Sequence, residues 1–220
     1  MHIRIEKNDK RYGYYAIKDI PKHSIILTEK AAVDVYNEPK HYEMFQILYK
    51  VFRDKKLKAK FSRLLPDTTV GNTLITCEMI KKDLELLDEL PEIRDYFLKI
   101  NAEELLLYCL KYLRNGFGTE EPMILFKGAM MNHSCIPNVI FIQKGNIMYF
   151  VTTRDIQQGE EICDTYLDIT LNKKDRQKRL LDQYGFICRC ERCIKETRKH
   201  KNAVQQILTM TQDISAYKLI

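Results

Sequence analysis

Residues 130–138 read MMNHSCIPN, and they place an amide, an imidazole, a hydroxyl and a thiol on consecutive residues, from Asn132 to Cys135. Neither the periodicity of an amphipathic helix nor the alternation of a half-buried strand predicts this order. The stretch therefore indicates a local chemical role, and the rest of the chain is needed to say which one.

The bulk composition is typical of a globular protein without a membrane segment. The 220 residues suggest one large domain or one domain with an insertion, and the hydrophobic fraction is 45%. The apolar runs are short and interrupted by charge, and the first residues lack the apolar centre of a secretory signal. We therefore expect a protein of the nucleus, the cytoplasm or both, with no membrane contact.

The chain alternates between strand-like and helix-like regions. Apolar residues at three- and four-residue spacing predict helices between about residues 38 and 115, and ordinary core packing explains those apolar faces. Short β-rich runs before this block, a hairpin turning at Gly145 and a basic helix after Asp168 complete the pattern. Strands are expected at 3–6, 14–17, 24–29, 31–36 and within 138–155, and helices at 45–52, 77–90, 102–113, 171–184 and 203–212.

Two short segments repeat one another. Residues 18–26, KDIPKHSII, match residues 154–162, RDIQQGEEI, in a basic-Asp-Ile start, a turn and a return to apolar sequence. Gly159 is expected to supply a positive φ in the second turn, and His23 stands at the equivalent place in the first. The repeat predicts two small β regions with the helical block inserted between them.

The cysteines are interpreted as metal ligands. Their number is odd (seven), and no export signal points to a disulfide-forming compartment. Residues 188–193, CRCERC, bring three thiols close enough to share one ion, and the flanking Arg189 and Arg192 favour thiolates. A structural zinc ion takes four ligands. The candidates for the fourth are Cys135, Cys77, Cys109, Cys163, His133 and His200; the alternative is three reduced cysteines on a basic surface.

Three motifs in order resemble the SET domain of protein lysine methyltransferases with its cysteine-rich post-SET segment. They are MMNHSCIPN, then GEEICDTYLD at 159–168, then DQYGFICRCERC at 182–193, and GYYAIKDIPKHSIILTE at 13–29 resembles the opening strands. The SMYD branch is the most similar. We expect it here without the MYND zinc module, since residues 35–38 run directly into helical sequence, and without the C-terminal helical repeat domain.

The resemblance implies an α+β fold of small β-sheets around a knot-like crossing, with a helical insertion and a zinc-binding post-SET segment. It divides the chain into N-terminal SET strands at 1–37, the insertion at 38–114, the SET core at 115–171, the post-SET segment at 172–198 and a C-terminal helix or tail at 199–220.

The resemblance also implies the site residues. Tyr166 would be the catalytic residue, and Phe117 and Tyr184 would line the lysine channel. Binding of S-adenosylmethionine would fall to Lys10, Tyr12, Gly13, Asn115, Asn132, His133, Tyr166 and Phe186. One structural zinc ion would be held by Cys135, Cys188, Cys190 and Cys193.

The chain departs from the family at its first cofactor motif, G-x-G. Arg11-Tyr12-Gly13 stands there after Lys10, so the first glycine is missing. Gly13 would still allow the main chain to approach the cofactor, and Lys10 or Arg11 would pair with the cofactor carboxylate.

The predicted function is therefore transfer of a methyl group from S-adenosylmethionine to a lysine of a histone or another protein. The alternative is an inactive SET-fold interaction module held together by zinc. A cysteine hydrolase is disfavoured, because Cys135 and His133 are two residues apart on one segment. The region 173–201 has eleven basic against four acidic residues, which favours a nucleosome contact or simply a solvated surface. A monomer is expected.

Overall fold

The computed structural model describes residues 3–8, 11–35, 42–72, 74–118 and 121–196. It divides into two compact units, one made of residues 1–29 and 130–220, the other of Lys30–Ala129. Lys10, His200 and the helix expected at 203–212 lie outside the described residues. The five-part division drawn from the sequence stays a prediction.

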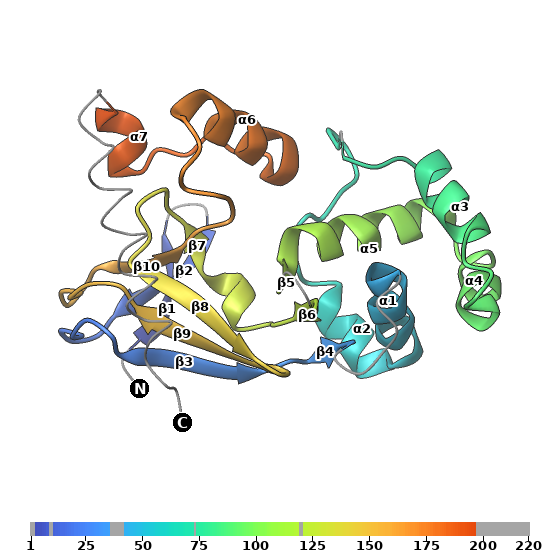
Figure 1. Ribbon diagram of the computed structural model, residues 1–220, viewed down its shortest axis with the longest axis horizontal. Helices are drawn as coiled ribbons and strands as arrows, with labels where there is room; N and C mark the ends of the chain where they lie inside the picture. Colours follow the sequence, from blue (N-terminus) through green and yellow to red (C-terminus); the bar gives the residue numbers. More distant parts are fainter. Residues whose placement is uncertain (1–2, 9–10, 36–41, 73, 119–120, 197–220) are drawn as a thin grey trace. The chain divides into compact units, whose positions relative to one another are not determined.

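The first unit contains a four-stranded sheet in the order β1-β2-β10-β7 (Figure 1). Strands β1 (Ile3–Asn8) and β2 (Arg11–Ala16) form a hairpin, and β10 (Glu161–Asp164) pairs antiparallel with β2. Strand β7 (Asn132–His133) pairs parallel with β10, with Cys163 opposite Asn132 and Asp164 opposite His133. This pairing places the Asn-His dipeptide beside the segment that leads to Tyr166.

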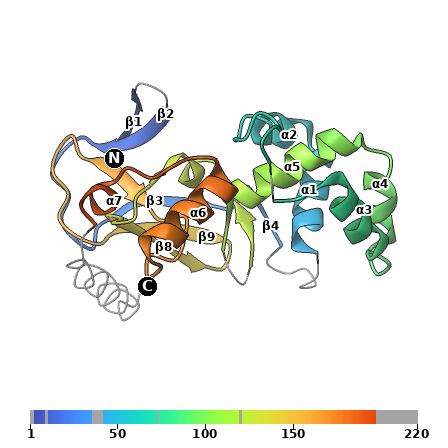
Figure 2. The same cartoon turned by 90° about the horizontal axis from the view of Figure 1, so that it is seen from above.

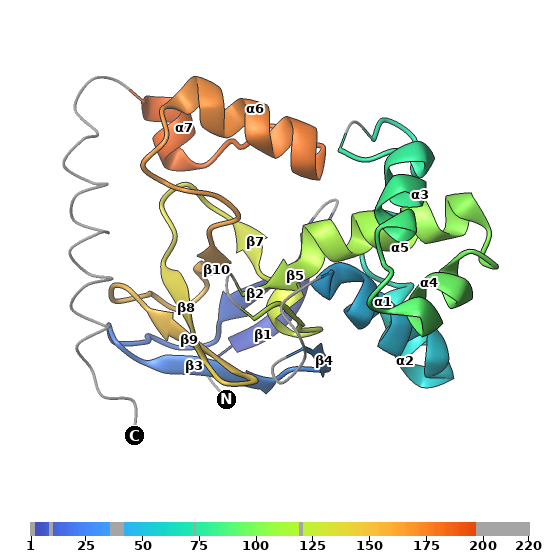
Figure 3. The same cartoon turned by 45° about the vertical axis from the view of Figure 1, so that its right-hand side comes forward.

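The second sheet of this unit has the order β3-β9-β8 (Figure 3). Strands β8 (Val139–Lys144) and β9 (Ile147–Thr152) form the hairpin expected from the sequence, with Gly145 at φ 57° in its two-residue turn. Strand β3 (Ile25–Lys30) adds to β9.

The two repeated corners pair with each other. Ile20 and Ile156 exchange main-chain hydrogen bonds, of 2.8 Å from the N–H of Ile20 and 2.9 Å from that of Ile156. His23 has φ 65° and Gly159 has φ 85°, so both corners use the left-handed conformation, as the sequence predicted. The repeat is therefore a local pseudo-symmetric contact that joins the two β regions.

Side chains follow the same exchange. Asp19 accepts a hydrogen bond from the N–H of Gln158 at 2.9 Å, and Asp155 accepts one from the N–H of Lys22 at 2.7 Å. Each corner thus satisfies a turn donor of the other, which explains why the aspartate recurs in both copies.

Two helices, drawn in orange to red in Figure 2, end the described part of the first unit. Helix α6 (Lys173–Tyr184) begins at Asn172, whose side chain accepts from the N–H of Asp175, and ends at Gly185, which has φ 75°. Helix α7 (Glu191–Lys195) follows the CRC sequence. The basic helix expected after Asp168 is confirmed.

The second unit is helical around its own hydrophobic core. A small sheet, β4-β6-β5, accompanies the helices, and no helix in the described ranges is long and apolar enough to cross a membrane. The predicted helices and their core packing are confirmed, except that the run expected at 77–90 ends at Glu85. The N–H groups of Leu86 and Leu87 bond to the carbonyls three residues earlier, which closes the last turn, and Pro91 begins a separate helix. The elements are α1 (Glu43–Arg53), α2 (Lys55–Phe61), α3 (Cys77–Glu85), α4 (Pro91–Phe97), α5 (Ala102–Asn115), β4 (Val33–Asp34), β5 (Gly116–Phe117), β6 (Met123–Ile124) and the 3-10 turn η1 (Gly128–Met130).

Candidate functional site

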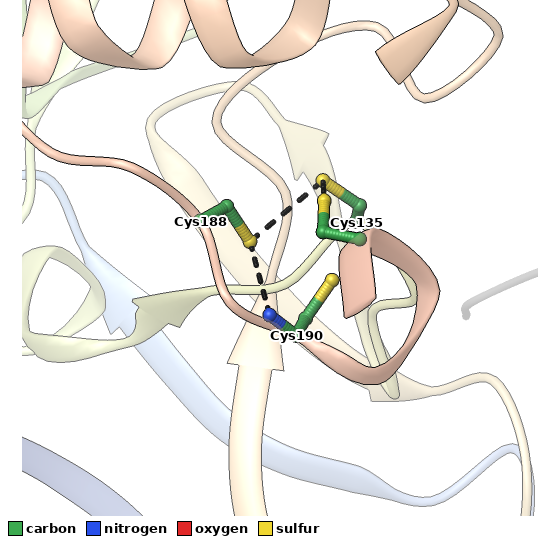
Figure 4. Close-up of side chains that lie close together, drawn as sticks. Cys135, Cys188 and Cys190 are labelled. Atoms are coloured by element: carbon green, nitrogen blue, oxygen red, sulfur yellow. Dashed lines mark hydrogen bonds between the residues drawn. The ribbon is translucent and has the colours of Figure 1, made fainter. Parts of the chain in front are cut away.

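Four cysteine sulfurs converge in the first unit. The Sγ atoms of Cys135, Cys188, Cys190 and Cys193 all lie within 4.8 Å of one another, with Cys135 at 3.9 Å from Cys188 and 3.5 Å from Cys193 (Figure 4). A tetrahedral zinc site with Zn–S bonds of about 2.3 Å has sulfur–sulfur edges of about 3.8 Å. The geometry fits one such ion, and it selects Cys135 among the six candidates for the fourth ligand.

The four candidate ligands come from two segments that are distant in the sequence. Cys135 follows β7, whereas Cys188 and Cys190 lie between α6 and α7 and Cys193 lies within α7. Gln177 of α6 fastens the second segment: its Oε1 accepts from the N–H of Cys188 at 2.9 Å, and its Nε2 donates to the carbonyl of Cys188 at 2.8 Å. Sequence reasoning missed Gln177, because nothing in a single glutamine of a basic helix distinguishes it.

Buried arginines surround the sulfurs. The side chain of Arg176 is fully buried, donates to Glu196 at 2.8 Å and lies 3.9 Å from the Sγ of Cys193. Arg192, also buried, donates to the carbonyls of Ile169 and Cys135. One carboxylate cannot balance two buried guanidinium groups, whereas a zinc ion with four thiolates carries a net charge of about −2. This charge balance supports the metal assignment independently of the distances.

The thiols hinder one another's ionisation when no cation is present. Hydrogen bonds that the Cys135 thiol donates to Cys188 and Cys190, followed by burial, raise the pKa of Cys135, while hydrogen bonds accepted from Cys135 and Cys188 lower the pKa of Cys190. Ionisation of one cysteine is therefore favoured, and ionisation of the others in the cluster is disfavoured. A divalent cation removes this opposition because it favours every thiolate that it binds.

Tyr166 is fixed at three points just beyond β10. Its N–H donates to the Nδ1 of His133 at 3.0 Å, and its hydroxyl donates to the carbonyl of Met131 at 2.6 Å. Its carbonyl accepts from the hydroxyl of Tyr184 at 3.3 Å, and the two rings have centroids 4.9 Å apart. Phe186 completes the aromatic group, 6.4 Å from each tyrosine ring.

Asn132 and Gly13 pack closely together. The Nδ2 of Asn132 donates to the carbonyl of Tyr12 at 3.0 Å and to the Oε1 of Glu161 at 2.7 Å. A Cβ at position 13 would lie only 2.6 Å from that Nδ2 and 2.9 Å from that Oε1. Glycine is required here so that Asn132 can approach. Glu161 was missed as a site residue, although it lies within the GEE motif.

The remaining predicted residues stand differently. Tyr12 contacts Asn132 through its main-chain carbonyl, while the residue is 57% exposed. Asn115 and Phe117 belong to the second unit, where the Nδ2 of Asn115 donates to the carbonyls of Leu65 at 2.6 Å and Lys111 at 2.8 Å. Phe117 is half-buried in β5.

The structure adds Asp164 to the candidates. This residue is 2% exposed, and its Oδ1 has no hydrogen-bond partner among the described residues. Burial raises the pKa of its carboxyl well above the usual range. The sequence could have predicted the burial of Asp164, because alternate residues of a strand share a face and Ile162 and Asp164 both lie on the buried face of β10.

Comparison with known proteins identifies the family. The SET domain model matches residues 11–167, which include every strand described above except β1, together with Asn132, His133 and Tyr166. The chain belongs to the SET domain family. A SET domain-containing protein, L678, of Acanthamoeba polyphaga mimivirus is 38% identical over 204 residues, covering 90% of this chain and 79% of that protein.

Lysine methyltransferases are among the relatives. The N-lysine methyltransferase SMYD2 of Homo sapiens is 36% identical over 166 residues, covering 66% of this chain. The match spans only 38% of the length of SMYD2. The predicted resemblance to this branch is confirmed.

Solved structures agree on the fold. The structure of Rubisco LSMT bound to AdoMet matches with a TM-score of 0.58 at 15% identity, covering 90% of this chain and 57% of that one. The SET domain of LSMT bound to lysine and AdoHcy matches with a TM-score of 0.57 at 16% identity over the same shares of the two chains. The predicted α+β SET fold is confirmed.

Proposed function

We propose that this chain is an S-adenosylmethionine-dependent protein lysine methyltransferase. The observation that carries the proposal is the three-point fixation of Tyr166 beside the Asn-His strand of a SET domain. A tyrosine held at its N–H, its carbonyl and its hydroxyl has a defined position, which is what alignment of two reacting groups requires.

The cofactor would be held mainly by residues of the first unit. Both ring nitrogens of His133 have partners inside the protein, so a cofactor would contact the main chain of His133 and not its ring. The Oδ1 of Asn132 would accept from it, since the Nδ2 is engaged. Gly13 and Phe186 would contact other parts of the cofactor. Lys10, Tyr12 and Asn115 remain proposed cofactor-binding residues.

When bound, S-adenosylmethionine supplies a sulfonium methyl, which an uncharged lysine amine takes as a C–N bond forms and the C–S bond breaks. The protein must favour that uncharged amine, because a free lysine has a pKa of about 10.4. The aromatic rings of Tyr166, Tyr184 and Phe186 are half-buried and contribute an apolar wall that disfavours the ammonium form. Phe117 would contribute to the same channel.

The hydroxyl of Tyr166 orients the amine and does not remove its proton. Its hydrogen is donated to the carbonyl of Met131, so toward the amine this oxygen would act as a hydrogen-bond acceptor. Proton loss then goes to water. Tyr166 is thus proposed as the catalytic residue through alignment and polarisation.

The finer features are proposed on the same basis. One zinc ion would join Cys135 to the post-SET segment and thereby hold Tyr184 and Phe186 near Tyr166. The substrate would be a lysine of a histone or another protein, with a nucleosome contact through the basic C-terminal region. We propose a monomer of the nucleus or the cytoplasm, with a helical insertion at 38–114 and a post-SET segment at 172–198.

Calorimetric titration of S-adenosylmethionine into the zinc-loaded chain tests the cofactor site without a known substrate. We expect binding in the wild type and its loss in Asn132→Ala. Transfer of a labelled methyl to candidate proteins then compares Tyr166→Phe with Tyr149→Phe, which changes a tyrosine of β9. Loss of transfer in Tyr166→Phe alone is expected; full transfer in that variant, or no cofactor binding by the folded wild type, contradicts the proposal.

A further inference from the structure

The imidazole of His133 connects the cysteine cluster to Tyr166. Its Nε2 lies 3.3 Å from the Sγ of Cys135, and its Nδ1 accepts the N–H of Tyr166 at 3.0 Å. The residue is 5% exposed, so water does not compete for either nitrogen. One ring thus spans the distance between a metal-ligand candidate and the proposed catalytic residue.

The two contacts fix the protonation pattern of the ring. An amide N–H can only donate, so the Nδ1 must carry the lone pair. The proton of a neutral imidazole is then on Nε2, where it points at the sulfur of Cys135. A hydrogen bond from N–H to a thiolate ligand is a second-shell contact of the kind that tunes metal affinity.

The main chain at Tyr166 needs this partner. The parallel pairing of β10 with β7 ends at Asp164 opposite His133, so the N–H of Tyr166 lies beyond the ladder. Without the ring it would be a donor with no strand partner. The hydroxyl contact with Met131 and the carbonyl contact with Tyr184 fix the other parts of the residue.

We propose that His133 is a positioning residue, which sets the main-chain position of Tyr166 by linking its N–H to the Cys135 thiolate of the metal cluster. The inference rests on the proposed function for its kinetic consequence. Its structural content is independent of that function, because the two hydrogen bonds can be tested without cofactor or substrate.

Two substitutions separate the two contacts. In His133→Asn the side-chain amide reaches the position of Nδ1, so Oδ1 can still accept from Tyr166 while the contact with Cys135 is lost. In His133→Gln the longer amide reaches the position of Nε2, so it can still donate to Cys135 while the acceptor for Tyr166 is lost. Each variant is the matched control of the other, and both keep the main chain of residue 133.

The thiolate contact is measured with cobalt(II) in place of zinc. We expect the thiolate-to-cobalt charge-transfer band to shift in His133→Asn and to stay near the wild-type position in His133→Gln. Zinc affinity, measured by competition with a chelator, should fall by about 10- to 100-fold in His133→Asn, the usual effect of losing a second-shell contact. The fall in His133→Gln should be smaller.

The tyrosine contact is measured by NMR of protein labelled with 15N-tyrosine, with the Tyr166 signal assigned through Tyr166→Phe. Its amide should exchange faster with solvent in His133→Gln than in His133→Asn. Where methyl transfer is measurable, kcat should fall by about 10- to 100-fold in His133→Gln with a smaller change in KM, and less in His133→Asn.

The link is supported if the cobalt band changes more in His133→Asn and the exchange of the Tyr166 amide changes more in His133→Gln. Equal effects of both variants on the cobalt band and on the Tyr166 amide, or no effect of either, overturn it. If the wild type neither binds S-adenosylmethionine nor transfers a methyl, the proposed function fails, and the cobalt and amide measurements still decide the role of His133.

Discussion

Replacement of Gly13 by alanine should separate cofactor binding from stability. The new Cβ would lie 2.6 Å from the Nδ2 of Asn132, about 0.8 Å short of the 3.4 Å at which ordinary contact begins. Asn132 must therefore withdraw, and its hydrogen bonds to Tyr12 and Glu161, of 3.0 Å and 2.7 Å, lengthen or break.

The two bonds contribute about 1 kcal/mol each to stability. Restriction of the unfolded chain on changing glycine to alanine returns about 0.4–1 kcal/mol. The net loss in Gly13→Ala should thus be about 1–1.6 kcal/mol. Affinity for S-adenosylmethionine should fall at least about tenfold, since losing about 1.4 kcal/mol of contact with Asn132 has that effect.

Gly159→Ala is the matched control. Gly159 has φ 85° and no atom within 4 Å of the added Cβ, so the substitution strains the main chain without a steric clash. The cost of that conformation is about 1–2 kcal/mol. Both variants should lose similar stability in thermal unfolding, but only Gly13→Ala should lose affinity in calorimetry. Equal affinity in the two variants would refute the role assigned to Asn132.

Three further outcomes are expected. Cys135→Ser should abolish tight binding of one zinc ion per chain, measured by elemental analysis after dialysis, whereas Cys77→Ser in the helical unit should keep it. Gln177→Leu removes both hydrogen bonds to Cys188 and should weaken zinc binding by about tenfold in a chelator titration; an unchanged affinity would show that the clamp is dispensable. Asp164 is more easily protonated in the folded than in the unfolded chain, so its stabilising contribution is present below the unfolded pKa of about 3.9 and is lost as the pH rises through the folded pKa. The melting temperature of Asp164→Asn minus that of the wild type should therefore increase from pH 5 to pH 8, and a constant difference would show that Asp164 ionises normally.

Local features of the fold were predictable because they depend on few residues. The hairpin at Gly145 and the positive φ at Gly159 follow from turn chemistry, and the helices of the second unit follow from apolar spacing. The end of α3 at Glu85 was missed, since apolar residues continue to Leu90 and no helix-ending residue stands at 86.

The long-range contacts of the site were not accessible to the same reasoning. Spacing alone could not select Cys135 as the candidate for the fourth ligand, because the choice depends on how the chain after β7 meets residues 188–193; only the family resemblance suggested it. The two hydrogen bonds between Gln177 and Cys188 and the burial of Arg176 could not be predicted for the same reason. In a basic helix, the sequence does not distinguish a buried polar residue from an exposed one.

The order of residues in the NHSC stretch follows from its place on a strand. Successive side chains of β7 point to opposite faces of the sheet. Asn132 therefore meets Gly13 and Glu161 on one face, while His133 turns to the other face, where it contacts Tyr166 and Cys135. The strand ends after His133, and Ser134 closes the turn by accepting from the N–H of Ile136 at 3.1 Å, which lets Cys135 point into the cluster. Exchanging Asn132 and His133 would send the imidazole toward the space beside Gly13 and remove it from both Cys135 and Tyr166, so the dipeptide specifies which face receives which chemistry.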